Sequence, residues 1–560
     1  MQLTGAEVMV KCLEEEGVST IFGYPGGAIL PFYNALRDVK NIKHVLTAHE
    51  QGAAHAADGY ARASGKVGVC CATSGPGATN LVTGLANAFL DSIPVVAITG
   101  QVKSSMIGHD AFQEVDITGI TMPITKQNFL VNKPEELAQT MRLAFQMAKS
   151  GRPGPVLVDV AHDVQTSMME YHASKLRELP VAMPQKELVA AAVAALNKAE
   201  RPVMLVGGGV AISGAEYEAV HLCEKMHLPV ASTLMGLGCI SSYREQFLGM
   251  SGLHQFLGMS GLHGHERANR AIANADVVLA VGTRFNDRVT GDRDKYSAHK
   301  TIIHIDIDPA ELNKNIESSI DIAGDMRTIL KMLDKGCKSH DIKAWWDTIM
   351  TWPSMDEDYG NNTAPLFIEA LNPLLKGKDY FVATDVGQHQ MFTAQHLKVE
   401  YARQLITSGG LGTMGFGLPA AMGAKFACPD KKVICISGDG GYKMTGSELF
   451  TLASNNVPVV SVVFNNSGLG MIRQLQTVQF NKRFMACECP GYVDFVKYAE
   501  AFGLEGEHVT TPEDFAAAVK RGLDKDHTYV IEVDINPKDM VVPMVAPGKG
   551  VDEFVQGLGE

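Results

Sequence analysis

The sequence lacks a hydrophobic run long enough to cross a membrane, and its cysteines form no recognisable framework. Its apolar stretches fall short of the roughly 18 residues that a spanning helix needs. The ten cysteines have neither disulfide-scaffold spacing nor His or Cys companions at zinc-site spacing. The first residues lack a basic segment followed by an apolar one, and Thr4 and Glu7 instead stand at capping-box spacing. We therefore expect free thiols, no membrane partner and a cytoplasmic location.

The chain also lacks an excess of positive charge. Its 49 Lys and Arg residues face 62 Asp and Glu residues, which gives a formal net charge of −13. Binding to nucleic acid needs a basic surplus to neutralise phosphates, so we expect no nucleic-acid partner. Small anionic ligands need only a few local donors and remain compatible with this charge.

What the sequence does contain is a repeated alternation of short β-branched runs with helix-length amphipathic stretches. With 560 residues, it is too long for one core and predicts several domains. Runs this apolar indicate strands buried on both faces of parallel sheets, with helices as crossovers. The clearest runs are VGVCCATSG, IPVVAITG, GPVLVDV, RPVMLVGGG, ADVVLAVGT, TIIHIDID, KKVICISGDG and VPVVSVVFNN.

Two stretches, near 165–190 and 340–365, lose this rhythm and are typical of linkers. They divide the chain into blocks of about the size of one doubly wound domain. The prediction is an α/β protein with three doubly wound parallel-sheet domains, over residues 1–170, 188–338 and 360–545.

The third block contains the sharpest chemical signal. One strand ends at Asp439 within Gly438–Gly441, and one crossover later the next strand ends at Asn466. The carboxyl ends of parallel strands share one sheet edge, where ligands of open α/β sheets bind. Mg²⁺ prefers oxygen ligands, which the Asp439 carboxylate, the Asn466 amide and the Gly468 carbonyl would supply. The alternative, an ordinary glycine turn and an Asn-rich loop, is disfavoured by this spacing.

These residues resemble the diphosphate–Mg²⁺ motif of thiamine-diphosphate enzymes. TDVGQHQ resembles that family's second diphosphate-contacting turn, and GGLGTMGFGLPAAMGA its aminopyrimidine segment. The resemblance implies that the Gly412 carbonyl receives the 4′-amino group and that Met414 wedges the coenzyme into a V shape. It implies further coenzyme contacts from Pro25, Gly26, Gly387, Gln388, His389, Gly440, Gly441 and Met471.

In the first block, Glu50 stands just before a helix rich in small residues. An acidic residue there is often only a helix cap that interacts favourably with the helix dipole. In thiamine-diphosphate enzymes the matching glutamate hydrogen-bonds N1′ of the pyrimidine and enables proton removal from C2. The family builds each site from two subunits, which implies a homodimer or tetramer with shared active sites.

Further strings resemble the catalytic subunits of the acetohydroxyacid synthase (acetolactate synthase) family over nearly the whole chain. The resemblance implies that Phe112 and Gln113 line the substrate pocket and that Arg288 grips the carboxylate of the second ketoacid. For Arg288 the alternative is a surface ion pair. The strings are FGYPGGAILPFYNAL, HEQGAAHAADGYAR, TSGPGATNL, DSIPVVAITGQV, IGHDAFQEVD, SGRPGPVLVDV, GTRFNDRVTG and HIDIDPAELNKN.

The resemblance implies that pyruvate is decarboxylated on thiamine diphosphate and that the hydroxyethyl unit is added to pyruvate or 2-ketobutyrate. The products feed branched-chain amino acid synthesis. The first, second and third blocks would bind the pyrimidine, FAD and the diphosphate with Mg²⁺, and a separate small regulatory subunit is implied. FAD candidates are Arg152, Gly207, Gly208, Gly209, Thr233, Leu262, His263, Arg284, Arg288, Asp306 and Asp325.

Two other functions stay open. One is a thiamine diphosphate/FAD pyruvate oxidase or a 2-ketoacid decarboxylase, which would give acetate or acetaldehyde. The other is a catalytically silent paralogue, although Glu50, Asp439 and Asn466 are all present. One departure from the family concerns selectivity, because Leu475 stands where a tryptophan that favours 2-ketobutyrate is usual.

The stretch from Gln246 to His263 contains the same nine residues twice. Nine residues is shorter than the 20 to 50 typical of stacked repeats. Only the second copy continues into the sequence expected after it. We expect the second copy to make cofactor contacts and the first to bulge from the loop.

Overall fold

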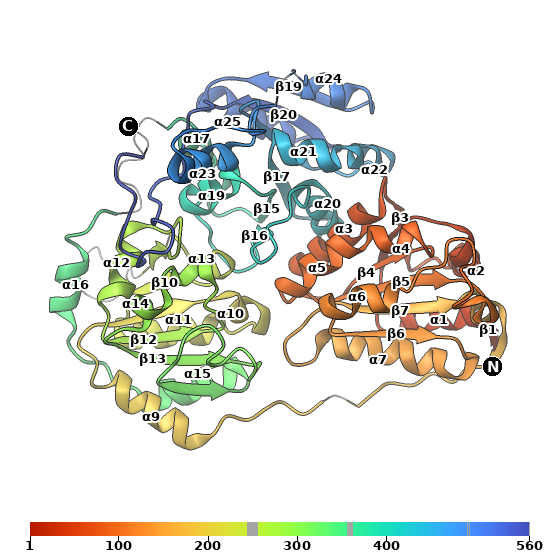
Figure 1. Cartoon of the computed structure of the whole chain (residues 1–560), viewed down its shortest axis with the longest axis horizontal. Helices are drawn as coiled ribbons and strands as arrows, with labels where there is room; N and C mark the ends of the chain where they lie inside the picture. The colour runs from red at the N-terminus through yellow and green to blue at the C-terminus, as the bar shows by residue number, and fades with distance from the viewer. Residues whose placement is uncertain (178, 244–255, 355–361, 490, 492, 559–560) are drawn as a thin grey trace.

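The computed structural model describes residues 1–177, 179–243, 256–354, 362–489, 491 and 493–558. It contains three six-stranded parallel sheets, each with helices on its faces, which form three lobes (Figure 1). A two-stranded antiparallel ribbon of β1 (Gln2–Thr4) and β8 (Met168–Glu170) adjoins the first lobe. The predicted fold class, three doubly wound α/β domains, is confirmed.

The N-terminal lobe occupies one side of the molecule (Figure 1). Its sheet contains, in spatial order, β3 (Lys43–Leu46), β2 (Thr20–Gly23), β4 (Gly68–Ala72), β5 (Val95–Gln101), β7 (Val156–Ala161) and β6 (Gln127–Val131). Its helices are α1 (Gly5–Glu15), α2 (Leu30–Leu36), α3 (Glu50–Ser64), α4 (Pro76–Asn80), α5 (Val82–Leu90), α6 (Ile117–Thr121), α7 (Leu137–Lys149) and α8 (His162–Thr166). Helix α1 begins with the predicted capping box between Thr4 and Glu7.

The middle lobe is built in the same way. Its strands are, in spatial order, β11 (Phe256–Met259), β10 (Val230–Ser232), β9 (Pro202–Val206), β12 (Val277–Val281), β13 (Thr301–Asp306) and β14 (Ile320–Ala323). Its helices are α9 (Lys186–Leu196), α10 (Gly208–Ser213), α11 (Glu216–Met226), α12 (Glu266–Asn274), α13 (Asp287–Thr290), α14 (Arg293–Ser297), α15 (Met326–Gly336) and α16 (Lys343–Ile349).

The C-terminal lobe adjoins the other two lobes, with β16 and α20 nearest to them (Figure 1). Its strands are, in spatial order, β16 (Leu405–Ile406), β15 (Tyr380–Thr384), β17 (Lys432–Gly438), β18 (Val460–Asn465), β20 (Tyr529–Asp534) and β19 (Glu505–Val509). Its helices are α17 (Ala364–Glu369), α18 (Asn372–Leu375), α19 (Gln388–His396), α20 (Gly417–Ala427), α21 (Asp439–Thr445), α22 (Leu449–Ser454), α23 (Gly470–Phe480), α24 (Phe495–Glu500) and α25 (Pro512–Leu523).

The stretch near 340–365 is more structured than its lack of strand rhythm indicated. Residues 343–349 form helix α16, whose two tryptophans are buried against the middle lobe. The Trp345 indole donates a hydrogen bond to the Pro202 carbonyl, and the Trp346 indole to the His227 carbonyl. The chain beyond β20 also returns to the middle lobe, where Val545 N donates to Leu262 O (Figure 1). Within the described ranges, no helix is both long and apolar enough to span a bilayer.

The N-terminal and C-terminal lobes meet where helix α3 lies against helix α20 (Figure 1). The two backbones approach so closely that a Cβ on Gly59 would overlap the Ala420 carbonyl, and a Cβ on Gly423 the Ala56 carbonyl. Small residues on both helices are therefore required for this contact. The contact therefore fixes helix α3 against the C-terminal lobe. This helix begins with the candidate site residue Glu50.

Replacing Gly423 by valine is expected to lower the free energy of unfolding by about 3 kcal/mol, because the added side chain must separate two packed backbones. Thermal unfolding of the purified variant measures the change. Gly27→Ala is the matched control, since a Cβ there would meet nothing within 4 Å. Equal unfolding midpoints for Gly423→Val and the unmodified protein would show that the helices can separate without cost.

Candidate active site

The strand ends of the C-terminal lobe gather the residues predicted to hold a metal and a diphosphate. Asp439 begins helix α21 directly after β17 and is only 1% exposed. Its Oδ2 atom lies 3.0 Å from Nζ of Lys443, one helical turn later. Asn466 follows β18, and its Oδ1 accepts a hydrogen bond of 3.1 Å from Gly468 N. The two predicted side-chain ligands thus follow neighbouring strands of one sheet.

The turn after β15 adjoins the same edge. A Cβ on Gly470 would lie 2.7 Å from Nδ2 of Asn466 and would overlap the Gln388 side chain. A Cβ on Gly438 would lie 2.9 Å from Nδ1 of His389. Gln388 and His389 are therefore neighbours of the residues around Asp439 and Asn466. Gly387 has a φ of +148°, which favours glycine at the start of this turn.

Asp385 is a central residue of this edge that sequence reasoning did not single out. Its buried carboxylate accepts backbone hydrogen bonds from Val386, Gly415 and Gly417 at 2.8 to 3.0 Å. Burial raises the pKa of this carboxyl to about 6, against the lowering effect of those backbone donors. Asp385 thus joins the diphosphate turn to the segment that contains Gly412 and Met414. The sequence signal that could have identified Asp385 is its position directly after a buried strand, β15.

The residues at this edge fit a bound diphosphate with a divalent metal. Nε2 of His389 is buried and has no hydrogen-bond partner in the described structure. Burial lowers the pKa of this imidazole to about 4, so the ring is neutral at pH 7. A Cβ on Gly440 would lie 2.7 Å from the Leu469 side chain and 3.2 Å from Met414, so only glycine leaves this space open. A neutral donor, open backbone and the Asp439 carboxylate are the groups that such a ligand requires.

A cavity of about 820 Å³ lies where the three lobes meet, and residues of all three line it. Its lining contains ten of the eleven FAD candidates. The exception is Gly207, whose N–H donates a hydrogen bond to Val281 O of the neighbouring strand. The lining also brings in three predicted coenzyme contacts of the C-terminal lobe and the unusual Leu475. These lining residues are Arg152, Gly208, Gly209, Thr233, Leu262, His263, Arg284, Arg288, Asp306, Asp325, Gly387, Gly412, Met471 and Leu475.

The cavity fits a large ligand with an anionic centre. Two arginines of its lining, Arg152 and Arg284, are partly or largely buried, and burial lowers the pKa of the Arg284 guanidinium. Nδ1 of His263 is buried without a partner in the described structure. The volume lies within the range of cofactor pockets. Arg288 is exposed and lies 3.7 Å from its neighbour Asp287, which is the surface ion pair weighed from sequence.

The second copy of the nine-residue repeat contributes to this cavity. Phe256–Met259 forms β11 at the edge of the middle sheet, and Leu262 and His263 line the cavity. The expected bulge of the first copy, residues 246–254, lies outside the described residues.

The remaining candidates form a separate group at the strand ends of the N-terminal lobe. Glu50 is the first residue of α3 and accepts a hydrogen bond of 2.9 Å from the Asn80 amide. A Cβ on Gly77 would lie 3.3 Å from Oε1 of Glu50. Gly26 adjoins Thr73 of the neighbouring strand end, and Pro25 precedes it. Of the described residues, those that line the cavity include none of this group.

The segment with Phe112 and Gln113 extends from the same lobe. Phe112 is 88% exposed, and Gln113 has a φ of +61°. A Cβ on Gly75 would lie 2.8 Å from the Gln113 carbonyl oxygen. The segment is anchored behind by Gln101, whose amide donates 2.9 Å hydrogen bonds to Val115 O and to the Asp159 carboxylate. Phe112 is therefore exposed to solvent, and its segment lies beside the same stretch, residues 75–77, that contacts Glu50.

Asp159 gives this anchor a pH dependence. Burial raises the pKa of its carboxyl to about 7, even though Thr99 and Gln101 donate hydrogen bonds to it. The unfolded carboxyl releases its proton near pH 4 and the folded one only near pH 7. The folded form therefore holds an extra proton between those values, and stability falls by about 1.4 kcal/mol per pH unit across that window.

Asp159→Asn removes this titration, so its unfolding midpoint relative to the unmodified protein is expected to rise from pH 5 to pH 7 and to level off above pH 7. Thermal unfolding across this range measures the difference. Asp38→Asn is the control, because Asp38 is exposed and the hydrogen bond from Arg37 lowers its pKa. A difference for Asp159→Asn that stays constant from pH 5 to pH 7 would contradict the raised pKa.

Comparisons with known proteins agree with this geometry. The chain matches three family models of thiamine pyrophosphate enzymes: the N-terminal TPP binding domain over residues 3–120, the central domain over 189–333 and the C-terminal TPP binding domain over 385–533.

Three curated relatives are similar over nearly their whole length. A probable acetolactate synthase large subunit of Methanocaldococcus jannaschii is 44% identical, over 99% of this chain and 96% of the relative. The acetolactate synthase isozyme 2 large subunit of Escherichia coli is 44% identical, over 99% of this chain and 100% of the relative. An acetolactate synthase of Mycobacterium bovis is 43% identical, over 100% of this chain and 92% of the relative.

Proposed function

The chain belongs to the family of acetolactate synthase large subunits among the thiamine pyrophosphate enzymes, and from this premise we propose how its residues perform that reaction. The substrates are pyruvate and a second 2-ketoacid, either pyruvate or 2-ketobutyrate. The products are 2-acetolactate and 2-aceto-2-hydroxybutyrate, which are precursors of branched-chain amino acids. The observation that carries the proposal is the placement of Asp439 and Asn466 at neighbouring strand ends beside a cavity that contains Arg288.

When bound, thiamine diphosphate supplies a carbon nucleophile and an electron sink for the carboxylate that leaves as CO₂. Asp439, Asn466 and the Gly468 carbonyl would hold Mg²⁺, and the backbone of Gly387, Gly440 and Gly441 and the ring of His389 would donate hydrogen bonds to the diphosphate. Gly412 and Met414 would hold the aminopyrimidine. The Glu50 carboxyl would share a proton with the ring nitrogen N1′ of the pyrimidine, and so would act as the acid–base group of the site.

The cavity between the lobes takes FAD and admits the second ketoacid. Among the cations of its lining, Arg284 and Arg152 would contact the flavin diphosphate, and Arg152 also forms an ion pair with Glu311. His263 and Leu262 come from the second repeat copy. The ion pair between Arg288 and Asp287 is exposed and 3.7 Å long, so breaking it costs little free energy. Arg288 can therefore turn its guanidinium toward a ketoacid carboxylate. Leu475 leaves more space beside the acceptor than a tryptophan would.

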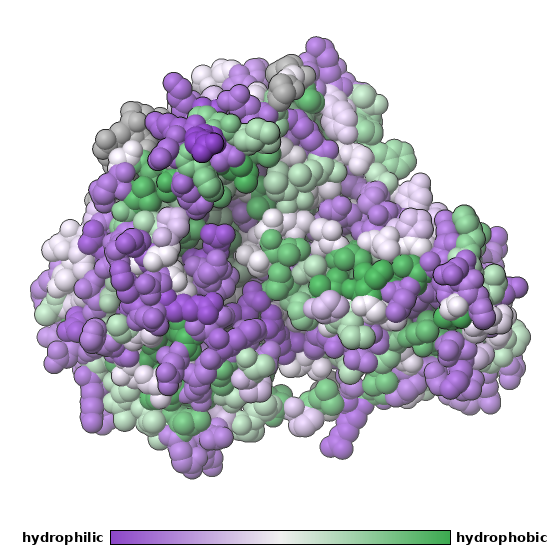
Figure 2. Space-filling model, viewed as in Figure 1, coloured by the Kyte–Doolittle hydropathy of each residue, from purple (hydrophilic) through white to green (hydrophobic). Residues whose placement is uncertain are grey.

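We propose that the enzyme is a homodimer, or a tetramer built from two such dimers, with Glu50 acting in the partner's site. Two observations support this proposal. Glu50 lies among residues of its own lobe rather than in the cavity lining. Exposed apolar residues of that lobe include Phe112, Ile120 and Met122, and Figure 2 shows an apolar surface on the N-terminal lobe. Large exposed apolar surfaces mark interfaces.

Two partner and location proposals go with this assignment. The relatives' names include "large subunit", which supports association with a small regulatory subunit. The ten cysteines are all described and none of them forms a disulfide, which supports a location in the reducing cytoplasm.

Product analysis tests the function directly. Purified protein is given pyruvate, thiamine diphosphate, Mg²⁺ and FAD, with and without 2-ketobutyrate. Acetolactate is expected, and formation of aceto-2-hydroxybutyrate in the mixed reaction reports the selectivity that Leu475 permits. Acetaldehyde or acetate as main product would instead identify a decarboxylase or a pyruvate oxidase. Bound coenzyme without turnover would identify a silent paralogue.

A further inference from the structure

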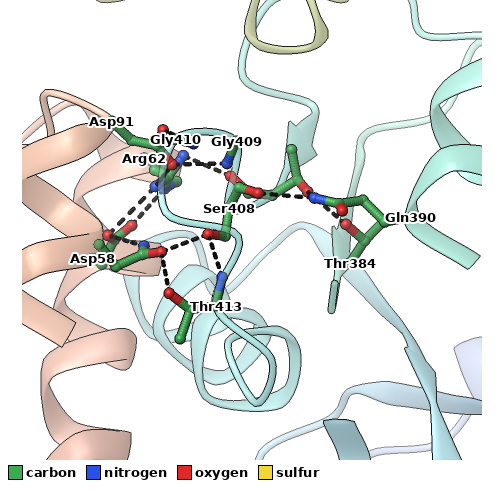
Figure 3. Close-up of polar contacts among 11 residues, drawn as sticks. Asp58, Arg62, Asp91, Thr384, Gln390, Ser408, Gly409, Gly410 and Thr413 are labelled. Atoms are coloured by element: carbon green, nitrogen blue, oxygen red, sulfur yellow. Dashed lines mark hydrogen bonds and ion pairs between the residues drawn. The ribbon is translucent and has the colours of Figure 1, made fainter. Parts of the chain in front are cut away.

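A buried network of polar side chains joins the N-terminal lobe to the segment Thr407–Thr413 of the C-terminal lobe (Figure 3). The N-terminal members come from α3 and from the end of α5. The C-terminal members include both ends of the segment that contains Gly412 and leads to Met414. Its side-chain and backbone members are Asp58, Arg62, Asn87, Asp91, Thr384, Gln390, Thr407, Ser408, Gly409, Gly410 and Thr413.

Asn87 closes this segment into a loop. Its Oδ1 atom accepts hydrogen bonds from the Ser408 hydroxyl at 2.6 Å and from the Thr413 hydroxyl at 3.0 Å. The Ser408 hydroxyl oxygen in turn accepts a hydrogen bond of 3.0 Å from Thr413 N. One amide oxygen of the N-terminal lobe therefore holds both ends of the loop. Asn87 is completely buried, so water cannot replace it.

Asp91 holds the middle of the same loop. Its carboxylate accepts backbone hydrogen bonds from Gly409 at 3.0 Å and from Gly410 at 2.7 Å (Figure 3). The same carboxylate also accepts a hydrogen bond from Nη2 of Arg62 at 2.8 Å. Removing this carboxylate would leave two backbone N–H groups without an acceptor, which costs free energy.

The charges behind the loop fix the geometry of these two residues. Arg62 bonds the Asp58 carboxylate and also donates to Thr407 O at 2.8 Å. The Asn87 amide nitrogen donates to Asp58 at 3.0 Å, which sets the direction of the amide oxygen. On the opposite side, Gln390 donates to Thr407 Oγ1 at 2.7 Å and to Ser408 O at 2.9 Å.

We propose that Asn87 and Asp91 are positioning residues for the pyrimidine half of the cofactor site of their own chain. The inference deepens the proposed function and rests on the roles it gives to Gly412 and Met414. Gly412 has a φ of +70°, lines the cavity and has only Val386 near its Cβ position. The N-terminal lobe therefore shapes the loop in two ways, through the buried Asn87 and through Asp91, which lines the cavity together with residues 408–412.

The two halves of the coenzyme allow a specific test. The diphosphate half contacts Gly387–His389 and Gly440, which have no bond to Asn87 or Asp91 among the hydrogen bonds of the described residues. Asn87→Ala is therefore expected to raise the Kd for thiamine diphosphate about tenfold and to leave the Kd for inorganic diphosphate unchanged. Calorimetric titration in the presence of Mg²⁺ measures both, with kcat and KM for pyruvate as a second readout.

A milder variant and a matched control complete the experiment. Thr413→Val removes one of the two hydroxyl donors to Asn87 with little change of shape, and a rise in Kd of about threefold is expected. Glu15→Gln weakens a partly buried ion pair with Arg142 that lies within the N-terminal lobe, and should change neither Kd. If Asn87→Ala does not fold, Thr413→Val decides the outcome.

Unchanged binding of thiamine diphosphate by Asn87→Ala would overturn the proposal. So would equal weakening for both probes, because that result indicates general loosening of the lobe. The binding measurement needs no turnover. If the unmodified protein makes no acetolactate, the proposed function fails while the positioning role is still decided by the two Kd values.

Discussion

Replacing Glu50 by glutamine is expected to reduce acetolactate formation at least about a hundredfold, the size of a general acid–base contribution. Glutamine keeps the shape of the side chain and an oxygen that can accept the 2.9 Å hydrogen bond from Asn80. It cannot exchange a proton with a ring nitrogen. The initial rate of acetolactate production from pyruvate measures the effect, and the Kd for thiamine diphosphate should change far less than the rate.

Glu216→Gln is the matched control for this prediction. Glu216 is also the first residue of a helix, α11, and is half-buried like Glu50, but it belongs to the middle lobe. If the only role of Glu50 were to interact with the dipole of its helix, the two variants would lose similar amounts of stability and neither would lose activity. Retained acetolactate formation by Glu50→Gln would remove Glu50 from the chemistry.

Strand positions could be predicted from sequence where strands are interior. All eight apolar runs identified form strands inside the three sheets, and the best examples, β5 and β18, are buried along their whole length. Edge strands such as β3 and β19 are exposed on part of their length and carry Lys, His and Glu. Their patterns therefore resemble those of loops, and only pairing with a neighbour identifies them.

The proximity of candidate site residues could be predicted where one motif contains several of them. Asp439, Asn466 and Gly468 belong to one crossover unit, and the order of strands fixes their proximity. Asn87 and Asp91 could not be found in this way, because their partners Ser408 and Gly409 are more than 300 residues away in sequence. An Asn within a small-residue helix carries no signal of its role until the two lobes are assembled.

Mixed dimers of Glu50→Gln and Asp439→Asn chains are expected to recover about half of the unmodified activity, although each variant alone is inactive. Asp439→Asn removes the buried carboxylate that would bind Mg²⁺ while it keeps the size of the side chain. In a mixed dimer with shared sites, one site combines an intact Asp439 with the partner's intact Glu50. The other site receives both defects. Purification through two different affinity tags isolates the mixed dimer for the rate measurement.

A second mixed dimer reverses this expectation and separates the two architectures. When one chain carries both substitutions and its partner carries neither, shared sites each contain one defect, and the dimer is expected to be inactive. If each site were completed within one chain, the unmodified chain would keep its own site, and this dimer would retain half of the activity. The first mixed dimer would then be inactive. Shared sites and sites within one chain thus predict opposite results for the two mixed dimers. Both dimers contain the same two substitutions, so differences in folding or expression cannot imitate the pattern expected for shared sites.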